Sequence, residues 1–343
     1  MRYPNFLKGN GTLGFVAPSL GCATEPYIQC FENAKNTFSK LGYHYIEGPN
    51  CSAALGIGIS NTPQLCAKEL NETYLNPEVD AIISCGGGEM MCEVVPFIRF
   101  DQIAASKAKW YVGYSDNTNF TFLSAVMADT AALYAPCVSD FGMETWHPAV
   151  QDTFDFITGK KDCFHNYDKW EIDKIKDEDH PLVGYNPTEP TVIKGFHLDS
   201  SNQAHFSGRL LGGCLDCLAV LCGTDFDMVK DFNERYKEDG IIWFLEACDL
   251  NVFGIRRVLW QLKNAGWFEH VKGFLIGRPG CYGEEFFGLN HYHAFTDLLD
   301  EFEVPILMDL DIGHKPPMMP MVCGGSADIV FEDNSFSIHY TFH

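Results

Sequence analysis

The sequence lacks several features that would assign it to common classes of protein. No apolar run reaches the roughly 18 residues that a membrane-spanning helix needs. The net charge is −22, and lysine and arginine form no cluster along the sequence. Binding to DNA or RNA depends on such basic patches. No internal repeat is visible. We therefore expect neither a membrane nor a nucleic acid as the partner.

We also expect no secretory signal. Residues 1–20 contain a short apolar stretch, but Gly11, Gly14 and Pro18 interrupt it, and the segment is more typical of a loop and a strand. The 14 cysteines are scattered through hydrophobic stretches, as expected of small buried side chains in a reducing compartment. The sequence therefore predicts a cytoplasmic protein.

The composition is that of a folded protein, with 46% hydrophobic and 14% aromatic residues. Its 343 residues exceed what one core usually supports, so we expect two domains. In the first half, strands alternate with helices, a pattern typical of an α/β fold with a mostly parallel sheet. We expect strands at residues 11–18, 79–85, 109–114 and 131–136, and helices at 25–41 and 117–128.

The second half repeats this alternation after a segment of different character. Residues 141–205 are charged, contain proline and show little periodicity, so we expect a long functional connection there. Beyond it, the pattern predicts strands and helices, and the tail predicts an antiparallel hairpin with a turn at 332–334. The expected strands are 240–247, 273–278 and 304–310, and the expected helices are 254–265 and 291–302.

Polar residues follow three apolar strands, in the stretches "GYSDNT", "WFLEACD" and "MDLDIGHKPP". Open α/β sheets build their sites at such strand ends. The stretches contain Ser115 at a strand-to-helix turn, Glu246 inside an apolar strand, where a carboxylate needs a partner, and His314 in a turn before two prolines. Together they supply a nucleophile, a carboxylate and an imidazole.

Each of these residues also has a purely structural interpretation. Ser115 or Asp116 could cap the following helix, and the elbow pattern G-x-S-x-G of α/β-hydrolases is broken at Asn117. Glu246 could pair with Arg256 or Arg257. The histidine could be an ordinary loop residue. The combination of the three favours a catalytic site more than any one of them does.

The run Gly86-Gly87-Gly88 follows a buried strand and exposes backbone N–H groups at the edge of the sheet. Such groups suit an oxyanion hole for acyl transfer. The alternative is a phosphate loop, but the run lacks the Lys-Ser/Thr of a P-loop and does not fit G-x-G-x-x-G. We therefore favour the oxyanion role.

The pair Cys214 and Cys217 forms a C-x-x-C. No second pair is present to complete a zinc site, and the thioredoxin context is absent, so we expect these thiols to pack on a buried helix. His291 and His293 would lie on different faces of their helix. The sequence therefore predicts no metal and no cofactor.

The motifs "VAPS", "GGG", "GYSDNT", "RLLGGCLDCLAVLCGT", "WFLEACD" and "GHKPPMMP" together resemble the LD-carboxypeptidase family of serine peptidases, and within it the microcin C self-immunity branch. They span residues 15 to about 325. The resemblance implies a Rossmann-like domain at 1–160, an interdomain loop at 161–205 and a smaller α/β domain with a β-rich core at 206–343. It also implies a homodimer.

The resemblance assigns roles to individual residues. Ser115 would be the nucleophile, His314 the general base and Glu246 the residue that orients the imidazole. Backbone N–H groups of Gly87 and Asp116 would form the oxyanion hole, with the Asp116 side chain holding the start of the helix.

The chain departs from the family pattern at one position, and one further role has two candidate residues. The family usually has asparagine where this chain has Cys214. In the immunity branch an aromatic residue of the interdomain loop stacks on the adenine of the substrate, and Trp170 and Tyr185 are the candidates here.

Amide hydrolysis through an acyl-enzyme is the expected reaction. One expected substrate class is an aminoacyl group joined to a modified adenylate, which the aromatic loop residues favour. The other is the amide before the terminal D-alanine of a muropeptide tetrapeptide. A non-catalytic protein that binds an anionic ligand at the glycine loop and helix start is the alternative of another class, and a general esterase is a further one.

Overall fold

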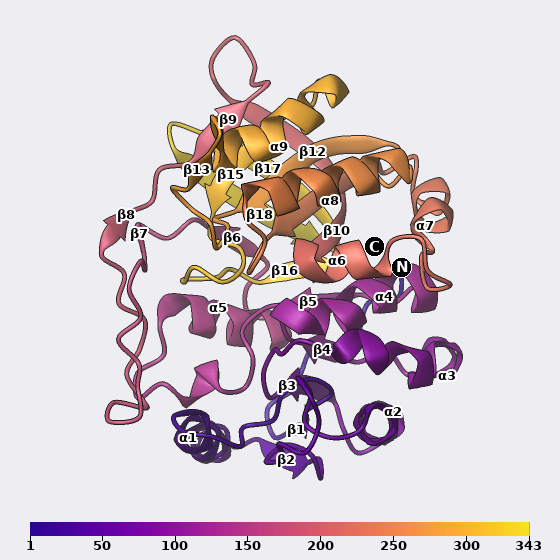
Figure 1. The fold of residues 1–343 in the computed structure, drawn as a ribbon. Coiled ribbons are helices and arrows are strands. Elements are labelled where there is room, and N and C mark those ends of the chain that lie inside the picture. Colours follow the sequence, from indigo (N-terminus) through magenta and orange to yellow (C-terminus); the bar gives the residue numbers. More distant parts are fainter. Residues whose placement is uncertain (343) are drawn as a thin grey trace.

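The computed structural model describes residues 1–342, which form two sheets with helices around them. In Figure 1 the first half of the chain, coloured indigo to magenta, lies below the second half, coloured orange to yellow. The architecture is α/β with parallel strands in both sheets, as predicted. In this described part of the chain, no helix is both long and apolar enough to cross a lipid bilayer.

The first sheet has the strand order β16-β5-β4-β3-β1-β2. Its five N-terminal strands are parallel, and β16 from the C-terminal part adds an antiparallel edge. All four residues of β3 are buried, which explains why this strand is a continuous apolar run. The strands are β1 (Thr12–Val16), β2 (His44–Glu47), β3 (Ala81–Ser84), β4 (Trp110–Val112), β5 (Ala132–Tyr134) and β16 (Met321–Cys323).

Helices and short 3₁₀ turns connect these strands. The predicted strands and helices of this half are present, with bounds that differ by a few residues at each end. The helices are α1 (Tyr27–Lys40), α2 (Pro63–Leu75), α3 (Phe100–Ala105), α4 (Thr118–Ala128) and α5 (Pro148–Ile157). The 3₁₀ turns are η1 (Met91–Glu93), η2 (Val95–Phe97), η3 (Ser115–Asn117) and η4 (Asp140–Gly142).

The second sheet has eight strands in the order β6-β18-β17-β10-β11-β12-β15-β9. The central strands β10, β11, β12 and β15 are parallel, and the predicted hairpin of the tail is the antiparallel pair β17 and β18. The strands are β6 (Cys163–His165), β9 (Lys194–Phe196), β10 (Ala204–Cys214), β11 (Ile241–Glu246), β12 (Val271–Gly277), β15 (Ile306–Leu310), β17 (Ser326–Glu332) and β18 (Ser335–Thr341).

Four helices accompany this sheet, and two small hairpins lie outside it. The helices are α6 (Leu215–Leu221), α7 (Val229–Arg235), α8 (Val252–Asn264) and α9 (His291–Leu299), which continues as the 3₁₀ turn η5 (Asp300–Phe302). The hairpins pair β7 (Lys169–Trp170) with β8 (Glu189–Pro190) and β13 (Glu285–Phe286) with β14 (Leu289–Asn290).

The expected interdomain loop at 161–205 contains more regular structure than predicted. Its ends belong to the second sheet, because β6 pairs with β18 and β9 pairs with β15. Its middle runs beside the first domain, where Glu144 N–H donates to the Leu182 carbonyl at 2.9 Å. The short strands of this segment escaped prediction because their hydrogen-bond partners lie far away in the sequence.

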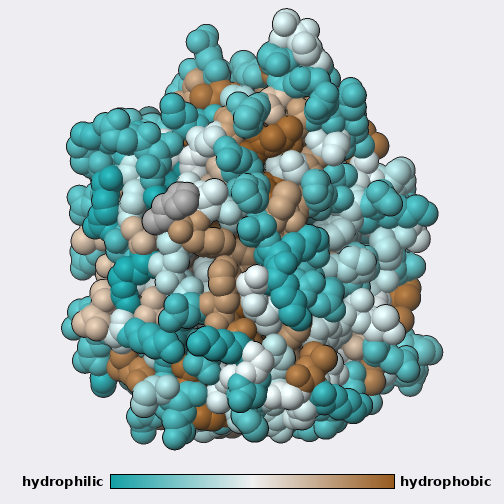
Figure 2. Space-filling view, turned by 180° about the vertical axis from the view of Figure 1, so that it is seen from behind, coloured by the Kyte–Doolittle hydropathy of each residue, from teal (hydrophilic) through white to brown (hydrophobic). Residues whose placement is uncertain are grey.

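Helix α4 lies between the two domains and is buried along nearly its whole length. The chain of β10 approaches it closely, since a Cβ on Gly213 would lie 2.6 Å from Thr118 Cγ2. This contact brings the start of α4 next to the carboxyl ends of β10 and β11. The outer surface is different: on the face in Figure 2 hydrophilic side chains predominate and hydrophobic ones are scattered among them.

Candidate active site

Ser115 stands three positions after the end of β4, at the turn that leads into α4. Its φ of +63° is in the left-handed region, which a residue with a side chain adopts at a cost in free energy. The Ser115 N–H donates to the Tyr134 hydroxyl at 3.1 Å, a bond that helps to hold this conformation. The turn therefore presents the serine side chain on a sharp elbow between strand and helix.

Asn117 replaces the second glycine of the usual elbow, and its side chain stabilises the turn. Its amide group donates to the carbonyl oxygens of Gly86 at 2.8 Å and Tyr114 at 3.1 Å. Its Oδ1 accepts a hydrogen bond from the Tyr111 hydroxyl. The asparagine therefore ties the elbow to the glycine loop.

The Asp116 side chain does not cap the helix, contrary to expectation. Its Oδ2 accepts hydrogen bonds from Ser19 Oγ at 2.6 Å and from Met91 N–H at 2.9 Å. Burial raises the pKa of Asp116, although both of these hydrogen bonds act to lower it. The carboxyl group thus links three separate segments around the serine, and this pairing outweighs the local capping preference.

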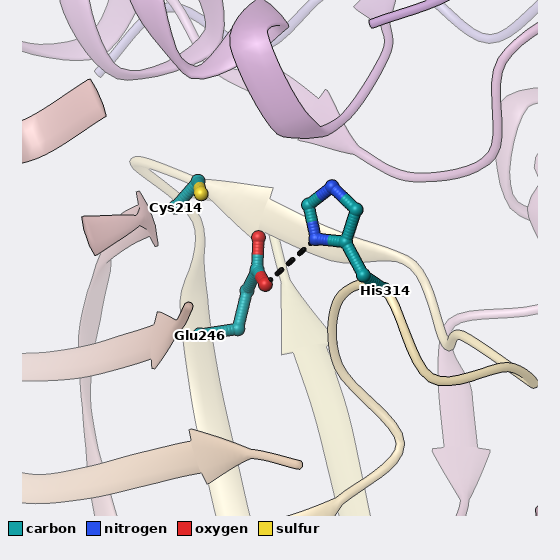
Figure 3. Close-up of side chains that lie close together, drawn as sticks. All are labelled: Cys214, Glu246 and His314. Carbon is teal, nitrogen blue, oxygen red and sulfur yellow. Dashed lines mark hydrogen bonds and ion pairs between the residues drawn. The ribbon is translucent and has the colours of Figure 1, made fainter. Parts of the chain in front are cut away.

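Ser115, His314 and Glu246 form a continuous chain of hydrogen bonds. His314 Nε2 lies 2.8 Å from Ser115 Oγ, and His314 Nδ1 lies 2.9 Å from Glu246 Oε2. The last of these contacts is visible in Figure 3. In the neutral tautomer that this geometry favours, the serine hydroxyl donates to Nε2 and the Nδ1–H donates to the carboxylate. The structure therefore brings together three residues that lie as many as 199 positions apart in the sequence.

The buried carboxylate and the imidazole shift the pKa of each other. Burial acts to raise the pKa of Glu246, but the charge of His314 and the hydrogen bonds to Glu246 hold it below its ordinary value. Burial acts to lower the pKa of His314, but the Glu246 carboxylate outweighs it and raises that pKa well above its ordinary value. Arg256, which the sequence offered as a possible ion-pair partner of Glu246, instead pairs with Asp297 at 2.6 Å.

Tyr134 is a residue of this site that the sequence analysis missed. It ends β5, and its hydroxyl accepts from Ser115 N–H while it donates to Glu246 Oε1. One side chain thus connects the elbow to the carboxylate of the other domain. Its place at the carboxyl end of a parallel strand is the signal that could have identified it.

Gly87 packs directly against the serine. A Cβ on this residue would lie 2.8 Å from Ser115 Cβ, 3.0 Å from Ser115 Oγ and 3.7 Å from Asp116 N. Among the hydrogen bonds of residues 1–342, neither the Gly87 nor the Asp116 N–H donates to a protein group outside its own helix or strand. Both positions of the predicted oxyanion hole are therefore close to the serine, and their N–H groups are available to a ligand.

Gly87→Ala is expected to lower kcat by about 10²–10³-fold, the cost of losing one oxyanion donor in other enzymes. The added methyl group would overlap the serine side chain and displace either the loop or the nucleophile. The matched control is Gly86→Ala, whose Cβ would meet only the Leu20 carbonyl oxygen, at an ordinary 3.6 Å. Steady-state kinetics of both variants checks this, and equal losses would contradict it.

A cavity of about 210 Å³ opens beside His314, between the two domains. Tyr185 of the predicted loop lines it, half-buried, and its hydroxyl donates to Asp140 at 3.3 Å. The lining also includes Tyr114 and three lysines, Lys174, Lys176 and Lys315. The cavity thus offers aromatic rings and positive charge together.

Trp170, the other aromatic candidate, lies in a different environment. It is 4% exposed and packs edge-on against Tyr282 at a ring distance of 5.0 Å, with the Arg278 guanidinium 5.0 Å from its ring. Its ring surface is therefore occupied by protein groups. Of the two candidates, Tyr185 is the one that lines the cavity beside His314.

A second, smaller cavity of about 90 Å³ is lined by Ser115 itself. It has the opposite character, because carboxylates and thiols line it. The carboxylates are Glu89, Asp116, Asp216 and Asp249, and the thiols are Cys92, Cys214, Cys217 and Cys248. Cys217 belongs to α6, whereas Cys214 ends β10, so only one member of the predicted buried pair lies within the helix.

Family comparisons agree with this two-domain site. Residues 13–135 match the model of the LD-carboxypeptidase N-terminal domain, and residues 207–329 match that of the LD-carboxypeptidase C-terminal domain. Ser115 lies in the first matched region, and Glu246 and His314 lie in the second.

Individual proteins show the same similarity. The microcin C7 self-immunity protein MccF of Escherichia coli is 27% identical over 95% of this chain and 92% of its own. A Bacillus subtilis protein named as a probable murein peptide carboxypeptidase is 23% identical over 94% and 90% of the two chains. A structure of MccF in complex with aspartyl sulfamoyl adenosine superposes with a TM-score of 0.80 at 21% identity, covering 98% of this chain and 99% of that one.

Proposed function

Because the chain belongs to the LD-carboxypeptidase family, we propose that it is a serine peptidase that hydrolyses an amide bond through an acyl-enzyme on Ser115. The observation that carries the proposal is the hydrogen-bond chain from Ser115 Oγ through His314 to Glu246. A hydroxyl, an imidazole and a buried carboxylate in this order are the parts that nucleophilic acyl transfer needs.

In the proposed reaction, His314 Nε2 takes the proton of Ser115 Oγ as the oxygen attacks the carbonyl carbon. The imidazolium then gives this proton to the leaving nitrogen, the amide bond breaks, and the acyl group stays on the serine. Water repeats the attack with His314 as its base and releases the acid. Glu246 holds the Nδ1 proton and stabilises the imidazolium in both halves of the reaction.

The backbone N–H groups of Gly87 and Asp116 are proposed to bind the oxyanion. They flank the serine, and each such donor contributes about 3–4 kcal/mol to the transition state in other enzymes. The burial of the surrounding groups strengthens this contribution, since a water-poor site screens the developing charge less.

The proposed substrate is an aminoacyl group joined through an amide-type bond to an adenylate analogue. The cavity beside His314 supports this class, because Tyr114 and Tyr185 can stack on a base, while Lys174 and Lys176 supply positive charge for an anionic linker. A relative of similar fold binds aspartyl sulfamoyl adenosine.

Tyr185→Ala is expected to raise the KM for an aminoacyl sulfamoyl adenosine by about 5–150-fold, because stacking of a base on an aromatic ring contributes about 1–3 kcal/mol. Tyr185→Phe keeps the ring and loses only the hydroxyl bond to Asp140, so its KM should stay close to that of the unmodified protein. Mass spectrometry of the released amino acid and sulfamoyl adenosine measures both.

The same assay with a muropeptide tetrapeptide tests the alternative substrate. Removal of its terminal D-alanine would make the protein an LD-carboxypeptidase of peptidoglycan recycling, with a lysine of the cavity binding the free carboxylate. This substrate carries no base, so its KM should not respond to Tyr185→Ala. Hydrolysis of neither compound would contradict both substrate proposals.

We also propose that the protein acts in the cytoplasm as a homodimer. All 14 cysteines are free thiols, which supports a reducing compartment. The dimer follows from the family resemblance, and light scattering decides it by comparing the particle mass with the 38.5 kDa of one chain.

A further inference from the structure

Cys214 lies beside the proposed catalytic residues, although the sequence predicted only a packing role for it. Its thiol sulfur, a Glu246 carboxylate oxygen and a His314 ring nitrogen all lie within 4.8 Å of one another. Figure 3 shows the three side chains converging from different elements. Cys214 is 2% exposed and Glu246 is fully buried, whereas the His314 side chain is 20% exposed.

The strand register explains why these residues meet. The parallel strands β10 and β11 place Cys214 directly opposite Glu246, and neighbouring strands are about 4.8 Å apart. His314 reaches the same point from the turn after β15, where Gly313 allows a close approach because a Cβ there would lie 2.5 Å from Glu246 Oε2. No sequence spacing signals such a cluster, since each member comes from a separate segment.

We propose that Cys214, Glu246 and His314 form a binding site for a thiophilic divalent cation such as Zn²⁺, and that this cation inhibits the enzyme. The inhibition rests on the proposed function, whereas the binding does not. A thiolate, a carboxylate and an imidazole are all common zinc ligands, and a three-residue set leaves the fourth tetrahedral position to water.

The geometry requires only small movements. Tetrahedral zinc with bonds of about 2.0–2.3 Å places its ligand atoms roughly 3.3–3.8 Å apart. The Cys214 sulfur therefore has to approach by no more than about 1.5 Å, because the three atoms lie within 4.8 Å of one another. The carboxylate and the imidazole, now 2.9 Å apart, have to separate slightly. As the sulfur–zinc bond forms, the thiol proton leaves to solvent. The second cavity, which Cys214 lines together with four carboxylates, gives a cation a negatively charged entrance to the site.

Inhibition follows from the shared atoms. The His314 nitrogen that faces Glu246 is Nδ1, so the cation would take Nδ1 and the carboxylate oxygen, which otherwise bond to each other. As Nδ1 binds the cation, its proton moves to Nε2, the atom that faces Ser115. An Nε2–H cannot take the serine proton, so the bound form has no general base. Cys214 is the only one of the three ligands without a part in the proposed reaction, and it makes the site selective for thiophilic ions.

The test compares three reduced, chelator-treated proteins: the unmodified chain, Cys214→Ser and the matched control Cys222→Ser, which replaces a half-buried cysteine at the end of α6. Zn²⁺ is titrated into each, and the remaining hydrolysis is expressed relative to the rate of the same protein without zinc. We expect reversible inhibition of the unmodified chain and of Cys222→Ser. For Cys214→Ser the inhibition constant should rise by about tenfold or more, because even the loss of a group that only supports a ligand costs 10–100-fold in affinity.

Calorimetry with Zn²⁺ tests the binding without a substrate, and Cd²⁺–thiolate absorption reports whether sulfur is a ligand. Both measurements should show one zinc site fewer in Cys214→Ser than in the unmodified chain, and no loss in Cys222→Ser. If Cys214→Ser does not fold, Cys214→Ala takes its place. Equal zinc affinity in all variants would overturn the inference. A protein that binds zinc through Cys214 but hydrolyses neither substrate would contradict only the proposed function.

Discussion

Ser115→Ala is expected to lower kcat by about 10⁴-fold or more and to leave the fold intact. Without Oγ no acyl-enzyme forms, and removal of the nucleophile in other serine peptidases costs up to about 10⁶-fold. The remaining turnover would come from the oxyanion donors and from substrate positioning. The substitution should not destabilise the fold, because the hydrogen bond from the backbone N–H of residue 115 to the Tyr134 hydroxyl remains.

The measurement is single-turnover hydrolysis with the substrate that the unmodified protein cleaves, together with ligand affinity by calorimetry. Ser106→Ala, at a half-buried position directly after α3, is the control for loss of a serine hydroxyl and should keep its full rate. The non-catalytic alternative makes the opposite prediction, because a binding protein would keep both ligand affinity and cellular effect in Ser115→Ala. Undiminished hydrolysis by this variant would refute the nucleophile assignment.

The elements that position the site were predictable because their signals are local. A continuous apolar run before Gly86 indicates a buried parallel strand, and polar residues after such strands gather at one sheet edge. Ser115, Glu246 and His314 all follow this rule. Their identification as one group needed the fold, because strand order brings together residues from two domains.

The remaining features depend on pairings that no local pattern encodes. Asp116 was expected to cap its own helix, yet it bonds to Ser19 and Met91, which the fold brings next to it. Tyr134 looked like an ordinary strand residue until its hydroxyl proved to touch Glu246 from another domain. Trp170 lies in a polar segment and still became buried, because Tyr282 and Arg278 cover it.

Glu246→Gln is the second variant with a large expected effect, a loss of about 10⁴-fold in kcat. A neutral amide cannot stabilise an imidazolium as a carboxylate does, so the histidine loses its charge partner. Because Tyr134 donates to Oε1, the amide NH2 would face Nδ1, and this favours the other histidine tautomer. A neutral His314 is the active form, and the carboxylate raises the pKa of His314 well above its ordinary value. In the unmodified protein, activity should therefore fall as the pH drops through this raised pKa.

Removing the charge of Glu246 removes the largest cause of that rise, although Cys248 still acts to raise the pKa of His314, and burial continues to lower it. The acid limb of kcat/KM in Glu246→Gln should therefore move to lower pH, even though the maximum rate is far smaller. Glu69→Gln is the control, because burial raises the pKa of Glu69 to about 7, which lies in the same pH window. If the acid limb moves in Glu69→Gln and stays in place in Glu246→Gln, the titrating group is Glu69 and His314 is not the base. If it moves in Glu246→Gln alone, the acid limb reports the titration of His314 beside Glu246.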